Sequence, residues 1–427
     1  MCVVPFTFRP RGYLHFDPPI NQEVATRLVT DPAAVAAHPF YPFILDTVTT
    51  QKIRKRAGGG VEYKAPKHRP IAYAAHKDAH IYTHYSAVLE ARYETVLRER
   101  GLYHVVTAFR RLGGRSNIHF ANEAFEFIRA RGCHHALASD ISDFFNQLDH
   151  RQLKRAWARL LGVRALPEDH YAVYKAITRY SLVDRNDLCR VLQLHPHRPR
   201  ADGRTRFCSP AEFRERVRGA GLCRPDSTGR GIPQGSPISA VLANLYLLEF
   251  DTAVNAFVTA HGGLYRRYCD DLLVLLPTAE LRDEARSLIT GRLQRLRLVA
   301  HPDKTEQIDF VQHGQVWRTD NSLNYLGFTF DGVHKRVRSA SIARYYRKMR
   351  RGVSRAKAIR HRVNQGADTR RGGPLRRWQL HLRYSYLGRH NFTSYVFRAA
   401  CLMNDPGMKH QIKDHWRKLQ GLISDAR

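Results

Sequence analysis

Two adjacent aspartates, Asp270 and Asp271, interrupt a run of apolar and aromatic residues at positions 264–276. Neighbouring carboxylates repel each other unless a proton or a cation lies between them, so such a pair can hold a divalent metal ion. Taken alone, the pair is better explained as a solvated Asp-Asp turn, and only the segments described below favour a metal site. A third carboxylate, Asp140, ends a segment of small residues at positions 136–140, and two aromatic residues follow it closely.

The residues around these aspartates predict short strands. Apolar, aromatic and β-branched residues flank the pair on both sides, which is typical of two strands joined by a tight turn. Asp270 and Asp271 would then lie at the tip of a hairpin. The strand that ends at Asp140 must run beside this hairpin if Asp140 and Asp270 are to share metal ions.

A glycine-rich segment, Gly-Ile-Pro-Gln-Gly-Ser-Pro-Ile-Ser at positions 231–239, precedes a helical pattern at 240–251. Its glycines allow a tight turn with close approach of the backbone to a substrate. Gln234 can then offer its amide to a nucleotide. We expect Ser236 or Ser239 to cap the following helix rather than to contact substrate.

These segments, together with Asn-Tyr-Leu-Gly-Phe-Thr-Phe at 324–330, resemble in order and separation the palm of reverse transcriptases. The matched positions are Asp140 for motif A, residues 231–239 for motif B, residues 268–271 for the Tyr-x-Asp-Asp box of motif C, Lys304 for motif D, and Tyr325, Leu326 and Gly327 for the primer grip. Five motifs in register are far more specific than one Tyr-x-Asp-Asp box.

The resemblance implies nucleotidyl transfer with two Mg²⁺ ions, which Mn²⁺ could replace. Two such ions, about 4 Å apart, stabilise the attacking and leaving oxygens together. Asp140 and Asp270 are implied as the bridging ligands, Asp271 as a weaker or more distant partner, and the Ile141 carbonyl as a further ligand. Magnesium takes oxygen ligands and needs few protein carboxylates when phosphates supply the rest.

The resemblance also implies which residues contact the incoming nucleotide. Arg69, with Lys67 as a second candidate, would cover the triphosphate, although each could instead be an exposed charge. Phe145 lies where the family has a bulky ring that crowds the ribose 2′-hydroxyl and so favours dNTPs. In the alternative, Phe145 is an ordinary core residue and Phe144 is the exposed ring. Lys304 would protonate the pyrophosphate leaving group, or it is a surface lysine on a turn.

We therefore expect an α+β protein with the right-hand polymerase architecture of fingers, an antiparallel-sheet palm and a helical thumb. The expected bounds are an N-terminal arm at 1–50, fingers at 51–131, a palm at 132–332 that includes some finger insertions at 151–230, and a basic helical thumb at 333–427. Most of the aromatic residues of the last segment are expected to form the core of the thumb. The set comprises Tyr345, Tyr346, Trp378, Tyr384, Tyr386, Phe392, Tyr395 and Trp416.

Composition points to a polyanionic partner. The 427 residues include 70 Lys or Arg and 38 Asp or Glu, a formal net charge of +32. Such an excess of positive charge indicates which partners the protein binds and says little about its fold. Residues 335–427 hold 24 of the basic and 4 of the acidic residues, so this segment carries +20 of that charge. Because no stretch of about 18 apolar residues occurs, we expect no membrane span.

Cysteine usage and the first residues indicate the compartment. Seven scattered cysteines without a CxxC pair fit reduced thiols, and early prolines interrupt any signal peptide, so we expect a cytoplasmic protein. A zinc site is conceivable among nearby cysteines and histidines, but their spacing matches no closed-site pattern. These residues are Cys189, His195, His197, Cys208 and Cys223.

Less specific features of the sequence resemble those of the bacterial defence-associated, antiphage reverse transcriptases, and most of all those of the type 2 group. They are the compact length, Arg69-Pro-Ile, residues 113–121, the His15-Phe-Asp arm and the Tyr-Cys-Asp-Asp box. That group implies cDNA synthesis from dNTPs on a non-coding RNA, which is both template and scaffold. Two alternatives stay open, as does the oligomeric state. One is a group II intron-like maturase acting mainly by RNA binding, and the other is a template-independent or protein-primed DNA polymerase of the abortive-infection type.

Overall fold

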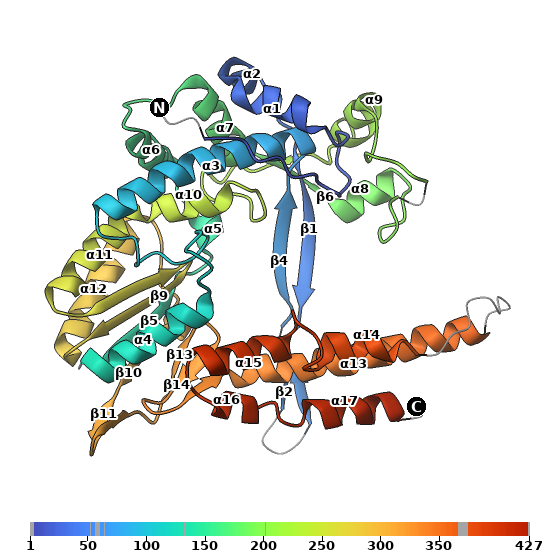
Figure 1. Ribbon diagram of the computed structural model, residues 1–427. Helices are drawn as coiled ribbons and strands as arrows, with labels where there is room; N and C mark the ends of the chain where they lie inside the picture. Colours follow the sequence, from blue (N-terminus) through green and yellow to red (C-terminus); the bar gives the residue numbers. More distant parts are fainter. Residues whose placement is uncertain are drawn as a thin grey trace. The chain divides into compact units, whose positions relative to one another are not determined.

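The computed structural model describes residues 4–51, 53–55, 60–63, 65–131, 134–200, 202–365 and 375–425 (Figure 1). The chain forms two compact units that alternate along the sequence. Unit 1 comprises Met1–Phe109, Ile141–Val254 and Leu288–Ala300, and unit 2 comprises Arg110–Asp140, Asn255–Ser287 and His301–Arg427. Each unit has its own sheets and its own buried apolar core.

Unit 1 contains a mixed four-stranded sheet in the order β4-β1-β6-β7. Strand β1 (Phe43–Thr50) pairs antiparallel with β4 (Lys67–Tyr73) from Ile44 to its end and parallel with β6 (Ser181–Asp184) near its start. Only the first residues of β1 are buried, so most of the long β1–β4 ribbon seen in Figure 1 is exposed. The predicted extended segment that carries Lys67 and Arg69 is therefore confirmed as strand β4.

Helices contact this sheet near the start of β1, and the N-terminal arm is fastened to one of them. Asp17 accepts hydrogen bonds from the backbone N–H groups of His76 and Lys77 at 2.8 and 2.9 Å, so its carboxylate stabilises the start of helix α3 (His76–Glu99). The arm thus contributes to the stability of the unit. The remaining elements are α1 (Gln22–Thr30), α2 (Pro32–Ala36), β2 (Ile53–Lys55), β3 (Val61–Tyr63), α5 (Phe144–Gln147), α6 (His150–Leu161), α7 (Glu168–Thr178), α8 (Arg185–Val191), α9 (Pro210–Glu212), the π-helix η1 (Phe213–Arg218), β7 (Arg224–Pro225) and α10 (Ser239–Tyr246).

Unit 2 is organised around an antiparallel sheet in the order β10-β5-β9-β8. Strands β8 (Leu264–Tyr268) and β9 (Asp271–Leu276) form the predicted hairpin, and β5 (His135–Asp140) lies between β9 and β10 (Glu306–Asp309). Five consecutive residues of β9 after Asp271 are buried, because the strand is central. Helix α4 (Asn117–Arg131) shares a buried core with this sheet. The predicted α+β class with an antiparallel palm sheet is confirmed.

The rest of unit 2 consists of small sheets followed by helices. Its elements are the 3₁₀ helix η2 (Pro302–Lys304), β11 (Val311–His313), β12 (Val316–Arg318), β13 (Leu323–Tyr325), β14 (Phe328–Phe330), β15 (Lys335–Val337), α13 (Ser339–Gln365), α14 (Arg377–Tyr384), α15 (Phe392–Leu402), α16 (Gly407–His410) and α17 (His415–Ser424). Helix α13 packs against α14 and α17, and Tyr345 and Tyr384 are buried in the core between them. Tyr346 and Phe392 pack against this core as well, whereas Trp378 and Tyr386 are 62% and 53% exposed and lie outside it.

The apolar run after motif B is broken into two helices. We expected one helix at 240–251, but α10 ends at Tyr246 and α11 (Leu248–Ala260) continues at an angle of 48°. The break coincides with hydrogen bonds from the Asn244 amide to the Ala108 carbonyl and from the Tyr246 hydroxyl to the Leu296 carbonyl. Helix α12 (Ala279–Arg295) follows the palm hairpin. Of the helices in the described ranges, none is by itself long and apolar enough to cross a membrane, whereas the bent pair of α10 and α11 is long and apolar enough when taken together.

Candidate active site

The three aspartates come together at one end of the β5–β9–β8 sheet. Asp140, the last residue of β5, lies directly opposite Asp271, the first residue of β9. Directly opposed residues of an antiparallel pair present their side chains on the same face. Asp270 precedes β9 in the two-residue turn, where Cys269 has a φ of 61°. The predicted neighbourhood of motif A and the hairpin is thus confirmed, and its register places Asp140 opposite Asp271.

A fully buried arginine supports this turn. Arg267 lies on β8, and its Nη1 donates a hydrogen bond of 3.1 Å to the carbonyl oxygen of Cys269. Burying a charged side chain costs free energy unless it is hydrogen-bonded. The bond from Arg267 meets that need and fixes the backbone turn that carries the aspartates. Sequence analysis missed this residue, although a charge inside a strand pattern is an available signal.

The surroundings of Asp271 make its carboxyl group harder to ionise. The pKa of Asp271 is raised to about 6, first because protein atoms surround its carboxyl group and then because Asp270 and Asp140 lie nearby, while Lys304 and Arg338 oppose the shift. As a whole the Asp271 residue is exposed, so the crowding comes from one side and solvent has access from the other. Such a site favours a bound cation, because positive charge would relieve the repulsion.

Lys304 also reaches this cluster. It ends helix η2, and its Nζ lies 2.5 Å from Oδ1 of Asp140, while about half of the lysine side chain is exposed. The backbone next to it is fixed as well, because the His301 N–H donates a 2.7 Å hydrogen bond to the Asp140 carbonyl. The motif D lysine is therefore a direct partner of the motif A aspartate rather than an isolated surface charge.

The donor set fits a hard divalent cation in an open site. Within the ranges that the structure describes, no group of three or more His, Cys, Asp or Glu side chains is arranged so that it could hold a metal ion by itself. Asp140, Asp270 and Asp271 offer only carboxylate oxygens, and Mg²⁺ binds through one or two carboxylates while water and substrate phosphates complete its shell. A closed structural zinc site, by contrast, would require four such side chains.

The predicted primer-grip residues lie where β13 meets β14. Tyr325 ends β13, and Leu326 and Gly327 form the turn. Leu326 and Gly327 have φ angles of 48° and 92°, and the Leu326 carbonyl accepts a 2.9 Å hydrogen bond from Nδ2 of Asn117. The Gly327 carbonyl accepts from the Arg338 N–H at 3.0 Å. Tyr325 is buried, and burial raises the pKa of its phenol. The turn is thus tied to α4 and to the segment just before α13.

Comparison with known proteins identifies this arrangement. Residues 64–330 match the family described as reverse transcriptase (RNA-dependent DNA polymerase). The chain belongs to the reverse transcriptase family. Its fold is accordingly the right-hand polymerase fold that the sequence motifs predicted.

Solved structures give a more distant likeness. The chain is similar to apo telomerase from Candida tropicalis, with 10% identity, a TM-score of 0.46 and coverage of 95% of this chain and 64% of that one. It is also similar to telomerase from Candida albicans in complex with the TWJ fragment of telomeric RNA, with 12% identity, a TM-score of 0.45 and coverage of 93% and 59%. The chain therefore spans less than two thirds of either telomerase chain. No curated protein matches the sequence.

In this reverse transcriptase, backbone hydrogen bonds within unit 1 connect the segments that carry the other residues predicted to bind the nucleotide. The Ala72 N–H of β4 donates to the Gln234 carbonyl at 2.7 Å, and the Ile232 N–H donates to the Phe145 carbonyl at 2.9 Å. Gly235 has a φ of +116°, and a Cβ there would lie 2.7 Å from the Ala72 carbonyl oxygen. The motif B turn therefore packs on the strand that also carries Arg69 and Lys67, both of them exposed.

Two further expectations about this region are settled by burial and hydrogen bonding. Phe144 is buried and Phe145 is half-buried, so the alternative in which Phe144 is the exposed ring was wrong. Neither serine caps α10, which also contradicts our prediction. Ser239 is already the first helical residue and donates to the Pro233 carbonyl at 2.7 Å, while Ile238 occupies the cap position.

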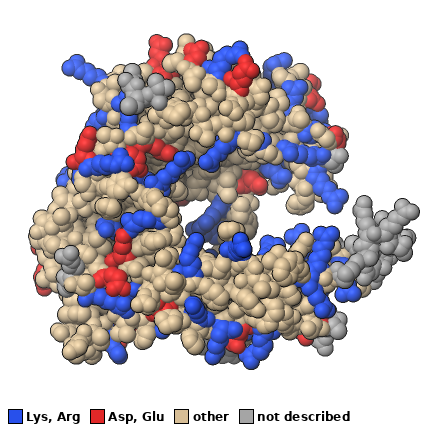
Figure 2. Space-filling view, in the orientation of Figure 1, with Lys and Arg blue, Asp and Glu red and all other residues tan. Residues whose placement is uncertain are grey.

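Unit 2 also carries a basic groove on its helices. The groove has a volume of about 830 Å³ and is lined by residues of α13, α14 and the segment that leads to α15. Its cationic members are Arg344, Lys348, Arg351, Arg355, Arg383 and Arg389. Figure 2 shows Lys and Arg side chains gathered over these helices. Clustered guanidinium and ammonium groups of this kind suit the phosphates of a nucleic acid.

Proposed function

We propose that this reverse transcriptase is an RNA-directed DNA polymerase that makes cDNA from a partner non-coding RNA. The observation that carries the proposal is the pairing of Asp140 with Asp271 across β5 and β9, with Lys304 on Asp140, inside a reverse transcriptase domain. Oxygen ligands and a positioned cationic acid are the two components that phosphoryl transfer to a nucleotide needs from the protein.

Each residue then has a definite task. Asp140 and Asp270 would hold the metal ions, with Asp271 as the weaker ligand and the Ile141 carbonyl as an additional one. Two bound Mg²⁺ ions, or Mn²⁺ in their place, would supply positive charge to the reacting oxygens. Lys304 donates a proton to the departing pyrophosphate.

The remaining contacts select the nucleotide and hold the primer. Arg69 and Lys67 neutralise the triphosphate, and the half-buried ring of Phe145 crowds a ribose 2′-hydroxyl, so dNTPs are preferred. Gln234 lies at a turn whose backbone can approach the substrate closely. Tyr325, Leu326 and Gly327 position the primer end.

We place the protein among the bacterial defence-associated reverse transcriptases, type 2, acting in the cytoplasm against phage. The support is the set of sequence features shared with that group and the concentration of positive charge in residues 335–427. The basic groove on α13 and α14 offers phosphate contacts to an RNA that is both template and scaffold.

The test is purification from bacterial cells that carry the native flanking DNA, followed by sequencing of the bound RNA and DNA. The matched control is the double variant Asp270→Ala with Asp271→Ala. We expect one small RNA to copurify with both proteins and its complementary DNA with the active protein alone.

Other outcomes would redirect the proposal. RNA without any DNA in either sample, including after phage infection, would indicate a maturase-like binding protein. DNA of biased composition without complementarity to the RNA would indicate untemplated synthesis, and a tyrosine covalently joined to DNA would indicate protein priming.

A further inference from the structure

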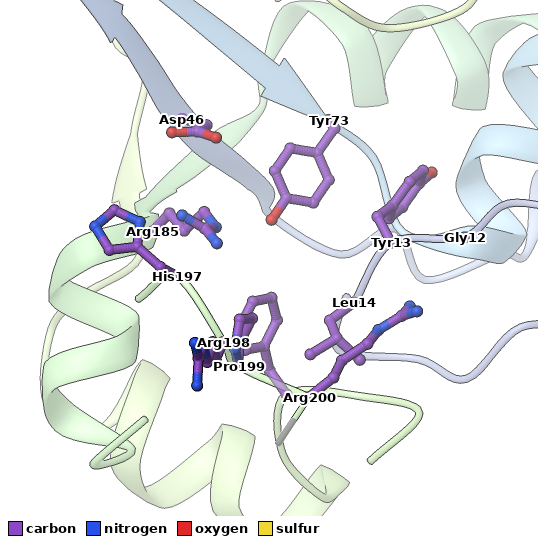
Figure 3. Close-up of a pocket in the computed structure, with 11 residues that line it drawn as sticks. Gly12, Tyr13, Leu14, Asp46, Tyr73, Arg185, His197, Arg198, Pro199 and Arg200 are labelled. Carbon is purple, nitrogen blue, oxygen red and sulfur yellow. The ribbon is translucent and has the colours of Figure 1, made fainter. Parts of the chain in front are cut away.

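Unit 1 contains a cavity that none of the predicted polymerase residues lines. Its volume is about 820 Å³, and it lies where the N-terminal arm, strands β1 and β4, the start of α8 and the loop before Phe207 meet. Figure 3 shows aromatic side chains from the arm and β4 facing arginines of this loop across open space. A volume of this size suits a small organic ligand.

Hydrogen bonds hold the walls of this cavity in place. Arg185 of α8 donates from Nη2 to the Pro196 carbonyl at 2.7 Å, which fixes the loop at one end. At its other end, the Phe207 N–H donates to the His15 carbonyl at 2.8 Å, so loop and arm are joined. The Tyr13 hydroxyl donates to the Ala74 carbonyl at 2.9 Å. The cavity is therefore formed before any ligand enters it.

One side of the cavity is aromatic. The rings of Tyr13 and Tyr73 meet edge to face with centroids 5.1 Å apart, and Tyr13 is also stacked on His76 with a centroid distance of 4.9 Å. Burial raises the pKa of the Tyr73 phenol, which Arg185 partly opposes, so Tyr73 stays a neutral hydrogen-bond donor. Rigid aromatic side chains with polar tips are suited to the face and edge of a nucleobase.

The other side is cationic. Arg198 and Arg200 line the cavity together with Arg185. In the described part of the chain, no carboxylate pairs with the guanidinium of Arg198 or of Arg200. Unpaired guanidinium groups favour phosphate, which they bind through two parallel hydrogen bonds. The single lining carboxylate, Asp46, can accept from a base amino group or a ribose hydroxyl.

We propose that this cavity binds a nucleoside phosphate, with the base beside Tyr13 and Tyr73 and the phosphate on Arg198 and Arg200. A bare anion would leave the aromatic side unused, and a metal ion would be repelled by three guanidinium groups. The ligand is either a free nucleotide or an unpaired nucleotide within an RNA, since both present the same groups. The inference does not depend on the proposed polymerase activity.

The test measures ligand binding by calorimetry with the full chain in EDTA, which suppresses metal-dependent binding at the aspartates. The probes are the four nucleoside 5′-monophosphates, guanosine, inorganic phosphate and a short single-stranded oligoribonucleotide. The test variant is Arg198→Ala with Arg200→Ala. The matched control is Arg190→Ala with Arg214→Ala, two exposed arginines of the same unit outside the cavity. Asp46→Asn, at an exposed position, gives a second variant with no reason to misfold.

We expect the test variant to weaken binding of at least one monophosphate by about tenfold or more, and the control to change it by less than about twofold. Asp46→Asn should change the order of preference among the four bases. If the test variant also binds the oligoribonucleotide more weakly, or if binding of the oligoribonucleotide alone is weakened, the natural ligand is a nucleotide within an RNA. If only the monophosphates are weakened, it is a free nucleotide.

Two results would overturn the inference. One is equal binding by the test variant and the control for every probe. The other is inorganic phosphate binding as tightly as the monophosphates, which would indicate a bare anion site. Primer extension on a homopolymer template, measured on the same preparations, tests the polymerase proposal separately.

Discussion

Asn117 connects the primer-grip turn to two helices of unit 2. Its Nδ2 donates hydrogen bonds of 2.9 Å to the Leu326 carbonyl and of 2.9 Å to the Tyr395 hydroxyl. Asn117 is the first residue of α4, whereas Tyr395 belongs to α15. One amide therefore holds the turn that is proposed to position the primer, and Asn117 acts as a positioning residue.

Replacing Asn117 by Ala should weaken primer binding. Loss of the bond to Leu326 costs about 1 kcal/mol, which corresponds to about a fivefold change. We expect that increase in KM for an annealed primer–template, with a smaller effect on KM for dNTPs. Tyr395→Phe removes only the second bond and serves as the control. Equal KM values for Asn117→Ala and the wild type would refute the positioning role.

Replacing Asp271 by Asn should make the metal-free protein more stable and the enzyme inactive. The substitution removes one of three mutually repelling carboxylates, so the melting temperature in EDTA should rise. Primer extension should fall by about a hundredfold or more. Added Mg²⁺ should raise the melting temperature of the wild type and have a much smaller effect on the variant. A lower melting temperature of the variant in EDTA would contradict this account.

Lys304 variants separate charge from proton transfer. Lys304→Arg keeps a cation near Asp140, but a guanidinium does not release its proton. Both Lys304→Arg and Lys304→Ala should therefore reduce turnover by about a hundredfold or more, measured as single-nucleotide incorporation. If Lys304→Arg retains the wild-type rate, the lysine contributes only its charge.

Adjacent phenylalanines should respond in opposite ways. Phe145→Ala opens space beside the nucleotide and should raise NTP incorporation relative to dNTP incorporation by about tenfold or more, at little cost in stability. Phe144 is 3% exposed, so Phe144→Ala should lower the free energy of unfolding by about 3–5 kcal/mol. Competition assays with mixed nucleotides and chemical denaturation provide the two measurements. An unchanged NTP preference in Phe145→Ala would refute the steric role.

Acid should weaken the attachment of the N-terminal arm. Burial lowers the pKa of His15 to about 3, whereas an unfolded histidine titrates near 6.5. The folded state thus disfavours the protonated ring, so its stability is complete above about pH 6.5 and decreases as the pH falls towards 3. His15→Gln, which lacks this titration, should lose less stability than the wild type between neutral pH and about pH 4. Parallel losses in the two proteins would argue against His15 as the cause.

Much of the candidate site could be predicted from sequence because its signals are local. The run of apolar residues around Asp270 and Asp271 predicted the hairpin, and the motif order predicted that β5 would lie beside it. The spacing of Pro302 and Lys304 did not show that the lysine would reach Asp140. That contact depends on the path of the chain after Ala300, which brings His301 to the Asp140 carbonyl.

Features that depend on distant partners were not predictable. Ser239 looked like a cap, but the Pro233 carbonyl takes its hydroxyl. The apolar pattern of the sequence continues across the break between α10 and α11 and gives no sign of it. The hydrogen bonds beside the break go to the carbonyls of Ala108 and Leu296, which are distant in the sequence. Asn117 went unrecognised because it acts on the backbone carbonyl of Leu326, and the residue types in a sequence do not show which carbonyl a side chain will reach. The proposed arm, fingers, palm and thumb boundaries remain predictions.

The alternation of the two units along the chain has a consequence for protein synthesis. Unit 1 requires residues 288–300, and the sheet of unit 2 requires β10. At about 5–20 residues per second, some 300 residues take about 15–60 s to translate. Strand β5 precedes the end of β10 by about 170 residues, so for about 8–34 s of that time it lacks a neighbouring strand and can pair with wrong partners. A break anywhere between residues 110 and 300 would likewise leave both units incomplete, so neither unit corresponds to one continuous expressed half of the gene.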